Sequence, residues 1–83
     1  MKYVLELEGD YGPIGSESFY WNGTKWQPGF SAFGAKKDDI VRYSDIETAE
    51  QALIEILLLL PLPPNEYVRV IQEDQISWID WKY

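Results

Sequence analysis

The chain has 83 residues and a net charge of −7, and 46% of its residues are hydrophobic, 16% aromatic and 25% charged. It contains no cysteine and no histidine, which excludes disulfides, thiolate nucleophiles, Cys/His zinc sites and imidazole acid–base catalysis. Length and composition predict one compact domain over residues 1–83.

The first half of the chain predicts strands. Lys2–Glu8 alternates apolar and polar residues, as a half-buried strand does, and a Gly/Pro-rich loop follows over residues 9–17. Asn22-Gly23, between Ser18–Trp21 and Thr24–Gln27, predicts a β-hairpin with a two-residue turn. In that register four side chains face the core: Phe19, Trp21, Thr24 and Trp26. Four others face water: Ser18, Tyr20, Lys25 and Gln27.

The second half predicts one helix between further strands. Ile40–Tyr43 is expected to be a short strand that leads into a helix over Ser44–Leu60. Ser44 and Glu47 match a capping box, and Pro61 ends the helix. The sheet-facing stripe comprises Ile46, Ala49, Ala52, Leu53, Ile56, Leu57 and Leu60. Glu66–Glu73 and Ile76–Tyr83 then predict a second hairpin around Asp74-Gln75.

The expected fold is therefore α+β. An antiparallel sheet of about five or six strands carries one helix packed on one face, in the order β-β-β-β-α-β-β. Phe30 and Phe33 lie in an irregular segment and are expected to fill the edge of the core.

The negative charge is unevenly distributed. Residues 1–43 carry five basic and six acidic groups, whereas residues 44–83 carry two basic and eight acidic groups. Direct nucleic-acid binding is disfavoured, because it needs clustered Lys and Arg. Either the acidic side chains form a solvated surface, or they bind a protein partner with a basic surface. The candidate acidic residues are Glu47, Glu50, Glu55, Glu73, Asp74 and Asp80.

Apolar residues outside the main helix stripe give a second candidate site. Ile54 and Leu58 are either covered by a loop or exposed as a patch for a partner or a second copy, so that a homodimer is possible. Trp78 and Trp81 are three residues apart, so a regular strand places them on opposite faces. One of the two therefore either binds a partner or is covered by another segment. We take Trp78 as the candidate contact.

Catalytic interpretations are weaker. Asp38-Asp39 and Asp45/Glu47 are possible carboxylate pairs, but acidic residues are expected in charged turns and in the first turn of a helix. We therefore predict no enzymatic activity, no cofactor and no metal site. The run Ala52–Leu60 is apolar except for Glu55 and is far shorter than the ~20 residues of a membrane span, which predicts a soluble protein without membrane contact.

Part of the sequence resembles a group of small uncharacterised proteins of phages and prophages. In those proteins a W-N-G-x-x-W-like hairpin precedes a short strand and an acid-capped helix with recurring alanines. Here the matching residues are Trp21–Trp26, Ala35-Lys36, Tyr43–Glu47, Ala49 and Ala52-Leu53, about half of the chain. The resemblance implies a fold and a mobile-element origin more than an activity, and the shared positions are structural. Some proteins of this group look like inhibitors of host nucleases or immune effectors, so the first hypothesis is an inhibitor of a host defence nuclease or immune effector, acting in the cytoplasm of a bacterial host cell. The alternative is a homo-oligomeric structural or accessory protein with no inhibitory role.

Overall fold

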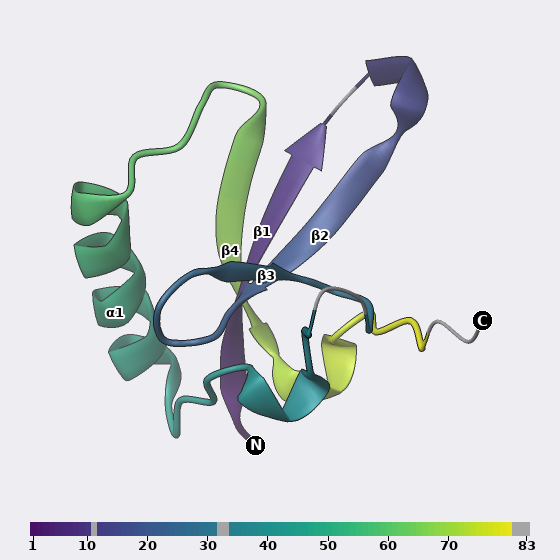
Figure 1. Cartoon of the computed structure of the whole chain (residues 1–83). Coiled ribbons are helices and arrows are strands. Elements are labelled where there is room, and N and C mark those ends of the chain that lie inside the picture. The colour runs from purple at the N-terminus through teal and green to yellow at the C-terminus, as the bar shows by residue number, and fades with distance from the viewer. Residues whose placement is uncertain (11, 32–33, 81–83) are drawn as a thin grey trace.

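A computed structural model describes residues 1–10, 12–31 and 34–80 (Figure 1). Within them, one α-helix packs on a four-stranded antiparallel sheet with strand order β3-β2-β1-β4. The elements are β1 (Tyr3–Asp10), η1 (Gly12–Ile14), β2 (Ser16–Trp21), β3 (Trp26–Pro28), η2 (Lys37–Asp39), α1 (Ile46–Leu59), β4 (Glu66–Gln72) and η3 (Glu73–Gln75), where η marks a 3-10 turn. The predicted α+β class is confirmed, but the described residues form four strands rather than five or six.

The central strand β1 is buried on both faces. Leu5 belongs to a cluster with Trp21, Ala49 and Ile56 beneath α1. The adjacent Val4 points to the opposite face, because successive side chains of a strand alternate. There it packs in a second cluster with Tyr20, Ile40 and Ile71. The sheet is therefore covered on both sides.

Helix α1 begins one residue later than the capping-box pattern predicts. Asp45 is the N-cap, and its Oδ1 accepts a hydrogen bond of 2.8 Å from the Thr48 backbone N–H. The predicted cap, Ser44, instead lies outside the helix, where its hydroxyl is 3.4 Å from the Asp45 carboxylate. The bond from the Thr48 N–H lowers the pKa of Asp45, since it favours the ionised carboxylate.

This cap assignment gives a matched pair of variants. Asp45→Ala is expected to lower the midpoint of thermal unfolding, whereas Ser44→Ala leaves it unchanged. Because the pKa of Asp45 is lowered on folding, its stabilisation is present above the ordinary carboxyl pKa and is lost as the pH falls through the lowered value. Thermal melts of both variants at neutral pH check the prediction, and a larger loss for Ser44→Ala would contradict it.

The Asn22-Gly23 hairpin forms, but its register differs from the prediction. Trp21 pairs with Trp26, not with Thr24, because the loop holds four residues rather than two. The Asn22 side-chain oxygen accepts hydrogen bonds of 3.0 and 2.9 Å from the backbone N–H groups of Thr24 and Lys25, which closes the longer loop. Trp21 and Trp26 still share a face, with ring centroids 5.2 Å apart.

Two side chains of this hairpin that were expected to face water are buried. Tyr20 is fully buried in the cluster on the face opposite α1. Gln27 is also buried, and its Nε2 donates a hydrogen bond of 2.8 Å to the Lys36 carbonyl. Both predictions were wrong because other parts of the chain pack on this face: Lys36 contacts Gln27, and the segment after η3 covers Tyr20.

That covering segment replaces the predicted second hairpin. After η3 the chain does not return along β4; Ile79 instead forms a parallel bridge to Phe30. The Ile79 N–H donates to the Gly29 carbonyl at 3.0 Å, and Ile76 and Trp78 pack on the Tyr20 cluster. Figure 1 shows this segment on the side of the sheet away from α1.

The remaining segments are irregular. Ile40–Tyr43 is not a strand: Tyr43 forms one antiparallel bridge with Tyr3, and the Val41 N–H donates to the Trp21 carbonyl at 2.9 Å. Phe30 is half-buried. Phe33 and Trp81 lie outside the described residues, so their predicted placements stay predictions.

Candidate functional site

The outer face of α1 presents apolar and acidic side chains together. Ile54 is 54% exposed and Leu58 is 79% exposed, so no loop covers them. At 100° per residue, Glu47 lies between these two residues around the helix axis. Glu50 and Glu55 flank them and are also exposed. We call these five residues the outer α1 face.

The carboxylates of this face have no positive neighbour on the helix. Residues 46–59 contain no Lys or Arg. Across residues 1–10, 12–31 and 34–80, the two ion pairs join Arg42 to Glu73 at 3.1 Å and Arg69 to Glu6 at 2.8 Å. The charge of the outer α1 face is therefore not neutralised by the rest of the described structure.

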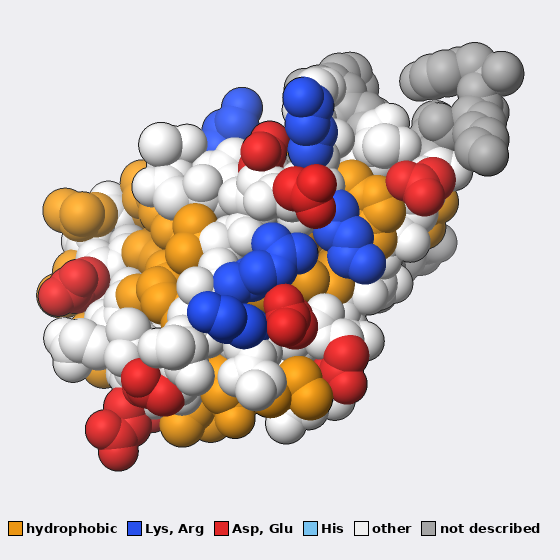
Figure 2. Space-filling view, turned by 90° about the horizontal axis from the view of Figure 1, so that it is seen from below, with side chains coloured by type: hydrophobic (Ala, Val, Ile, Leu, Met, Phe, Trp, Pro, Cys, Tyr) orange, Lys and Arg blue, Asp and Glu red, His pale blue; other side chains and the backbone are white. Residues whose placement is uncertain are grey.

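The six predicted acidic residues do not form one surface. Glu73, Asp74 and Asp80 lie on η3 and the C-terminal segment, across the sheet from α1 (Figure 1). Figure 2 views the end of the molecule that carries the N-terminus, η2 and η3, where Lys and Arg side chains lie among the acidic ones. The negative charge there is partly compensated, unlike that of the outer α1 face.

Trp78, the third predicted apolar contact, is half-buried against the Tyr20 cluster. Its indole N–H donates a hydrogen bond of 3.0 Å to the Asp80 carboxylate. Trp78 therefore helps to hold the C-terminal segment on the sheet, the bond to Asp80 is local to that segment, and neither residue lies near Ile54 and Leu58.

Beside the outer α1 face, two neighbouring hollows open between α1 and the β2–β3 hairpin. The first, of about 320 Å³, is lined by Leu7, Phe19, Trp26, Leu60, Pro61, Leu62, Pro63 and Glu66. The second, of about 270 Å³, is lined by Trp21, Tyr43, Ala52, Glu55, Ile56, Leu59 and Leu60. Leu60 belongs to both, so we call the two hollows together the α1 groove. Sequence patterns missed it, because residues far apart in the chain, from Leu7 to Glu66, build it.

The groove exists because α1 packs mainly on β1 and β4 rather than on β2 and β3. Trp21 of β2 is 8% exposed in the cluster beneath α1, whereas Trp26 of β3 is only half-buried. The Trp26 indole N–H is buried and has no hydrogen-bond partner among the described residues. Leu59 is 81% exposed at the groove's edge. Large apolar side chains thus border open space on this side.

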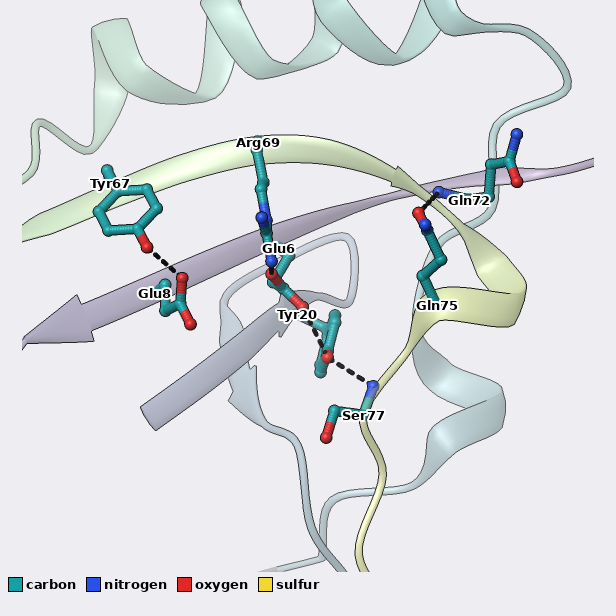
Figure 3. Close-up of polar contacts among 8 residues, drawn as sticks. All are labelled: Glu6, Glu8, Tyr20, Tyr67, Arg69, Gln72, Gln75 and Ser77. Carbon is teal, nitrogen blue, oxygen red and sulfur yellow. Dashed lines mark hydrogen bonds and ion pairs between the residues drawn. The ribbon is translucent and has the colours of Figure 1, made fainter. Parts of the chain in front are cut away.

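A buried polar network lies on the other face of the sheet (Figure 3). Glu6 is only 3% exposed, and its carboxylate accepts hydrogen bonds from Arg69 at 2.9 Å and from the Tyr20 hydroxyl at 2.8 Å. The same hydroxyl accepts a bond of 2.8 Å from the Ser77 N–H. Burial raises the pKa of Tyr20 to about 12. Since each of these polar groups is partnered, we assign the network to stability.

A smaller contact lies next to this network. The Tyr67 hydroxyl donates a hydrogen bond to Glu8, and this bond raises the pKa of Tyr67 (Figure 3).

Among residues 1–10, 12–31 and 34–80, no three acidic side chains gather in the way a metal site requires.

None of the helices in the described part of the chain has the length and hydrophobicity needed to cross a bilayer.

Comparison of the chain with protein-family models, with curated proteins and with solved structures finds no match.

Proposed function

We propose that this chain is a non-enzymatic protein-binding domain whose outer α1 face contacts a partner with a basic surface. The observation that carries the proposal is the exposure of Ile54 and Leu58 beside three glutamates that have no ion pair in the described structure. Desolvation of the apolar pair supplies affinity, and the carboxylates select a complementary charge and speed encounter.

The specific form of this function that we propose is inhibition of a host defence nuclease or immune effector in a bacterial cytoplasm. Proteins that hold nucleic acid present clustered Lys and Arg to the phosphates. A helix face with Glu47, Glu50 and Glu55 is complementary to such a groove. The sequence resemblance to small phage and prophage proteins, some of which look like such inhibitors, is the reason for choosing this form.

The proposal is tested by charge reversal. Immobilised chain is exposed to bacterial lysate at about 50 mM salt, and bound proteins are eluted with rising salt. We expect a basic protein to be retained and to elute well below about 500 mM salt. The triple variant Glu47→Lys/Glu50→Lys/Glu55→Lys should lose it completely, because each glutamate becomes a repulsive contact.

The matched control is Asp38→Lys/Asp39→Lys/Asp74→Lys, which makes the same change in net charge at exposed residues of η2 and η3. This control should retain the partner with an unchanged elution position. Equal loss in both triple variants would show that net charge alone is responsible and would contradict the proposal.

The exposed leucines favour a second candidate function, a homo-oligomeric accessory protein. Leu58 and Leu59 are about as exposed as each other, at 79% and 81%, and a second copy could cover them. Face-to-face pairing through the outer α1 face would, however, bring the glutamates of both copies together. Sedimentation at high concentration is therefore expected to show a monomer. If sedimentation instead shows a dimer, and the Leu58→Asp variant is a monomer, the second function is favoured.

A further inference from the structure

We propose that the α1 groove binds a short segment of the basic partner, in which apolar side chains alternate with Lys or Arg. The inference rests on the proposed function and adds a second contact next to the outer α1 face. Glu55 links the two sites, because it belongs to the outer α1 face and also lines the groove.

The shape and lining of the groove indicate apolar side chains in its interior. Its two hollows, of about 320 and 270 Å³, are each larger than a leucine side chain and are separated by Leu60. Trp26 is half-buried and lines one hollow, whereas Trp21, which is only 8% exposed, lines the other. A half-buried tryptophan in such a hollow is the kind of residue that dominates binding energy when an apolar side chain packs on it.

The charge around the groove indicates basic residues beside those apolar side chains. Among the described residues, the one charged side chain that lines the first hollow is Glu66, and the one that lines the second is Glu55. Neither forms an ion pair within the described residues. The described lining of both hollows thus includes a carboxylate and no Lys or Arg, which favours Lys or Arg on the bound segment and disfavours an acidic one.

The two indole groups report directly on this groove. A synthetic peptide of twelve residues with alternating Lys and Leu is titrated into the isotopically labelled full chain. The matched control peptide alternates Lys and Ser, so that it has the same charge without apolar side chains. We expect the Lys/Leu peptide to shift the indole N–H signals of Trp21 and Trp26 and the control peptide to leave them in place. Equal shifts with both peptides, or none with either, would overturn the proposal.

Two exposed apolar residues provide a test variant and a control. Leu59, 81% exposed, lines the groove, whereas Ile79, 55% exposed, lies in the C-terminal segment and lines neither hollow. Leu59→Lys should weaken binding of the Lys/Leu peptide about tenfold, because it places a cation in the hollow, and Ile79→Lys should change it less than about twofold. Equal effects would overturn the groove assignment.

The proposed function and this inference can fail separately. If the partner is lost with the Glu47/Glu50/Glu55 reversal but binds Leu59→Lys normally, the outer α1 face stands and the groove assignment is overturned. If the reversal has no effect on the partner, the proposed function itself is contradicted.

Discussion

Tyr20→Phe is expected to lower the free energy of unfolding by about 3 kcal/mol, although it removes a single oxygen atom. The Tyr20 hydroxyl donates to the Glu6 carboxylate and accepts from the Ser77 N–H, both at 2.8 Å. Its loss leaves a buried carboxylate oxygen and a part-buried backbone donor without these partners, and each unsatisfied group costs about 1–3 kcal/mol. Chemical denaturation at neutral pH measures the difference.

The pH dependence of that difference tests its cause. Burial raises the pKa of Tyr20 from 10.0 to about 12. Because the pKa is higher in the folded state, the stabilisation by Tyr20 is complete below pH 10 and is lost as the pH rises towards 12. Phenylalanine cannot ionise, so the stability gap between Tyr20→Phe and the parent chain should narrow over this interval. A gap that stays constant to pH 12 would contradict the assignment.

Gly29→Ala is expected to destabilise the fold by about 2 kcal/mol through steric displacement. A Cβ at this position would lie 2.9 Å from Cε2 of Tyr20 and 3.0 Å from the carbonyl oxygen of Ser77. Tyr20 is fully buried, and the Ser77 oxygen belongs to the backbone, so neither atom can move away without a large energetic cost. The C-terminal segment must therefore shift away from the sheet. Thermal or chemical unfolding measures the loss.

A double-mutant cycle distinguishes this displacement from a general loss of stability. Trp78→Ala removes a side chain that packs the same segment onto the Tyr20 cluster. If Gly29→Ala has already moved the segment, Trp78→Ala should cost clearly less in that background than in the parent chain. Strictly additive costs would show that the segment stays in place and that the steric explanation is wrong.

Local sequence patterns were sufficient to predict the helices and strands that short-range interactions determine. The helix was predicted from its 3.6-residue periodicity and from Pro61, and its observed bounds, Ile46–Leu59, differ from Ser44–Leu60 by two residues or fewer. Strand β1 and the hairpin at Asn22-Gly23 were also found. The hairpin register was missed because the Asn22 side chain closes a four-residue loop, a contact that competes with the two-residue turn.

Features set by distant contacts could not be predicted. Tyr20 was assigned to water by alternation, but it is buried because residues 76–80 cross the far face of the sheet. The expected hairpin after β4 failed for the same reason: Glu73–Gln75 forms a 3-10 turn, and Ile79 then pairs with Phe30. Periodicity reports which residues share a face, but it does not report which segment covers that face.

The candidate site likewise combines features that periodicity predicted with features that depend on distant packing. Periodicity placed Ile54 and Leu58 outside the main stripe but left open whether a loop covers them, and their exposure decides this. Trp26 packs against the core cluster beneath α1, as expected, but it also lines an open hollow, because α1 packs mainly on β1 and β4 rather than on β2 and β3. That lateral position depends on the packing of the whole sheet, so no local pattern contains it.

The most direct test of the central claim is an amide footprint of the partner. The isotopically labelled chain is titrated with the basic protein recovered from lysate, and amide NMR signals are followed residue by residue. We predict that the largest shifts lie in α1, around Glu47, Ile54 and Leu58, and that η3 and residues 76–80 are unaffected. Shifts concentrated in η3 and residues 76–80, with α1 unchanged, would contradict the assignment of the outer α1 face as the binding surface.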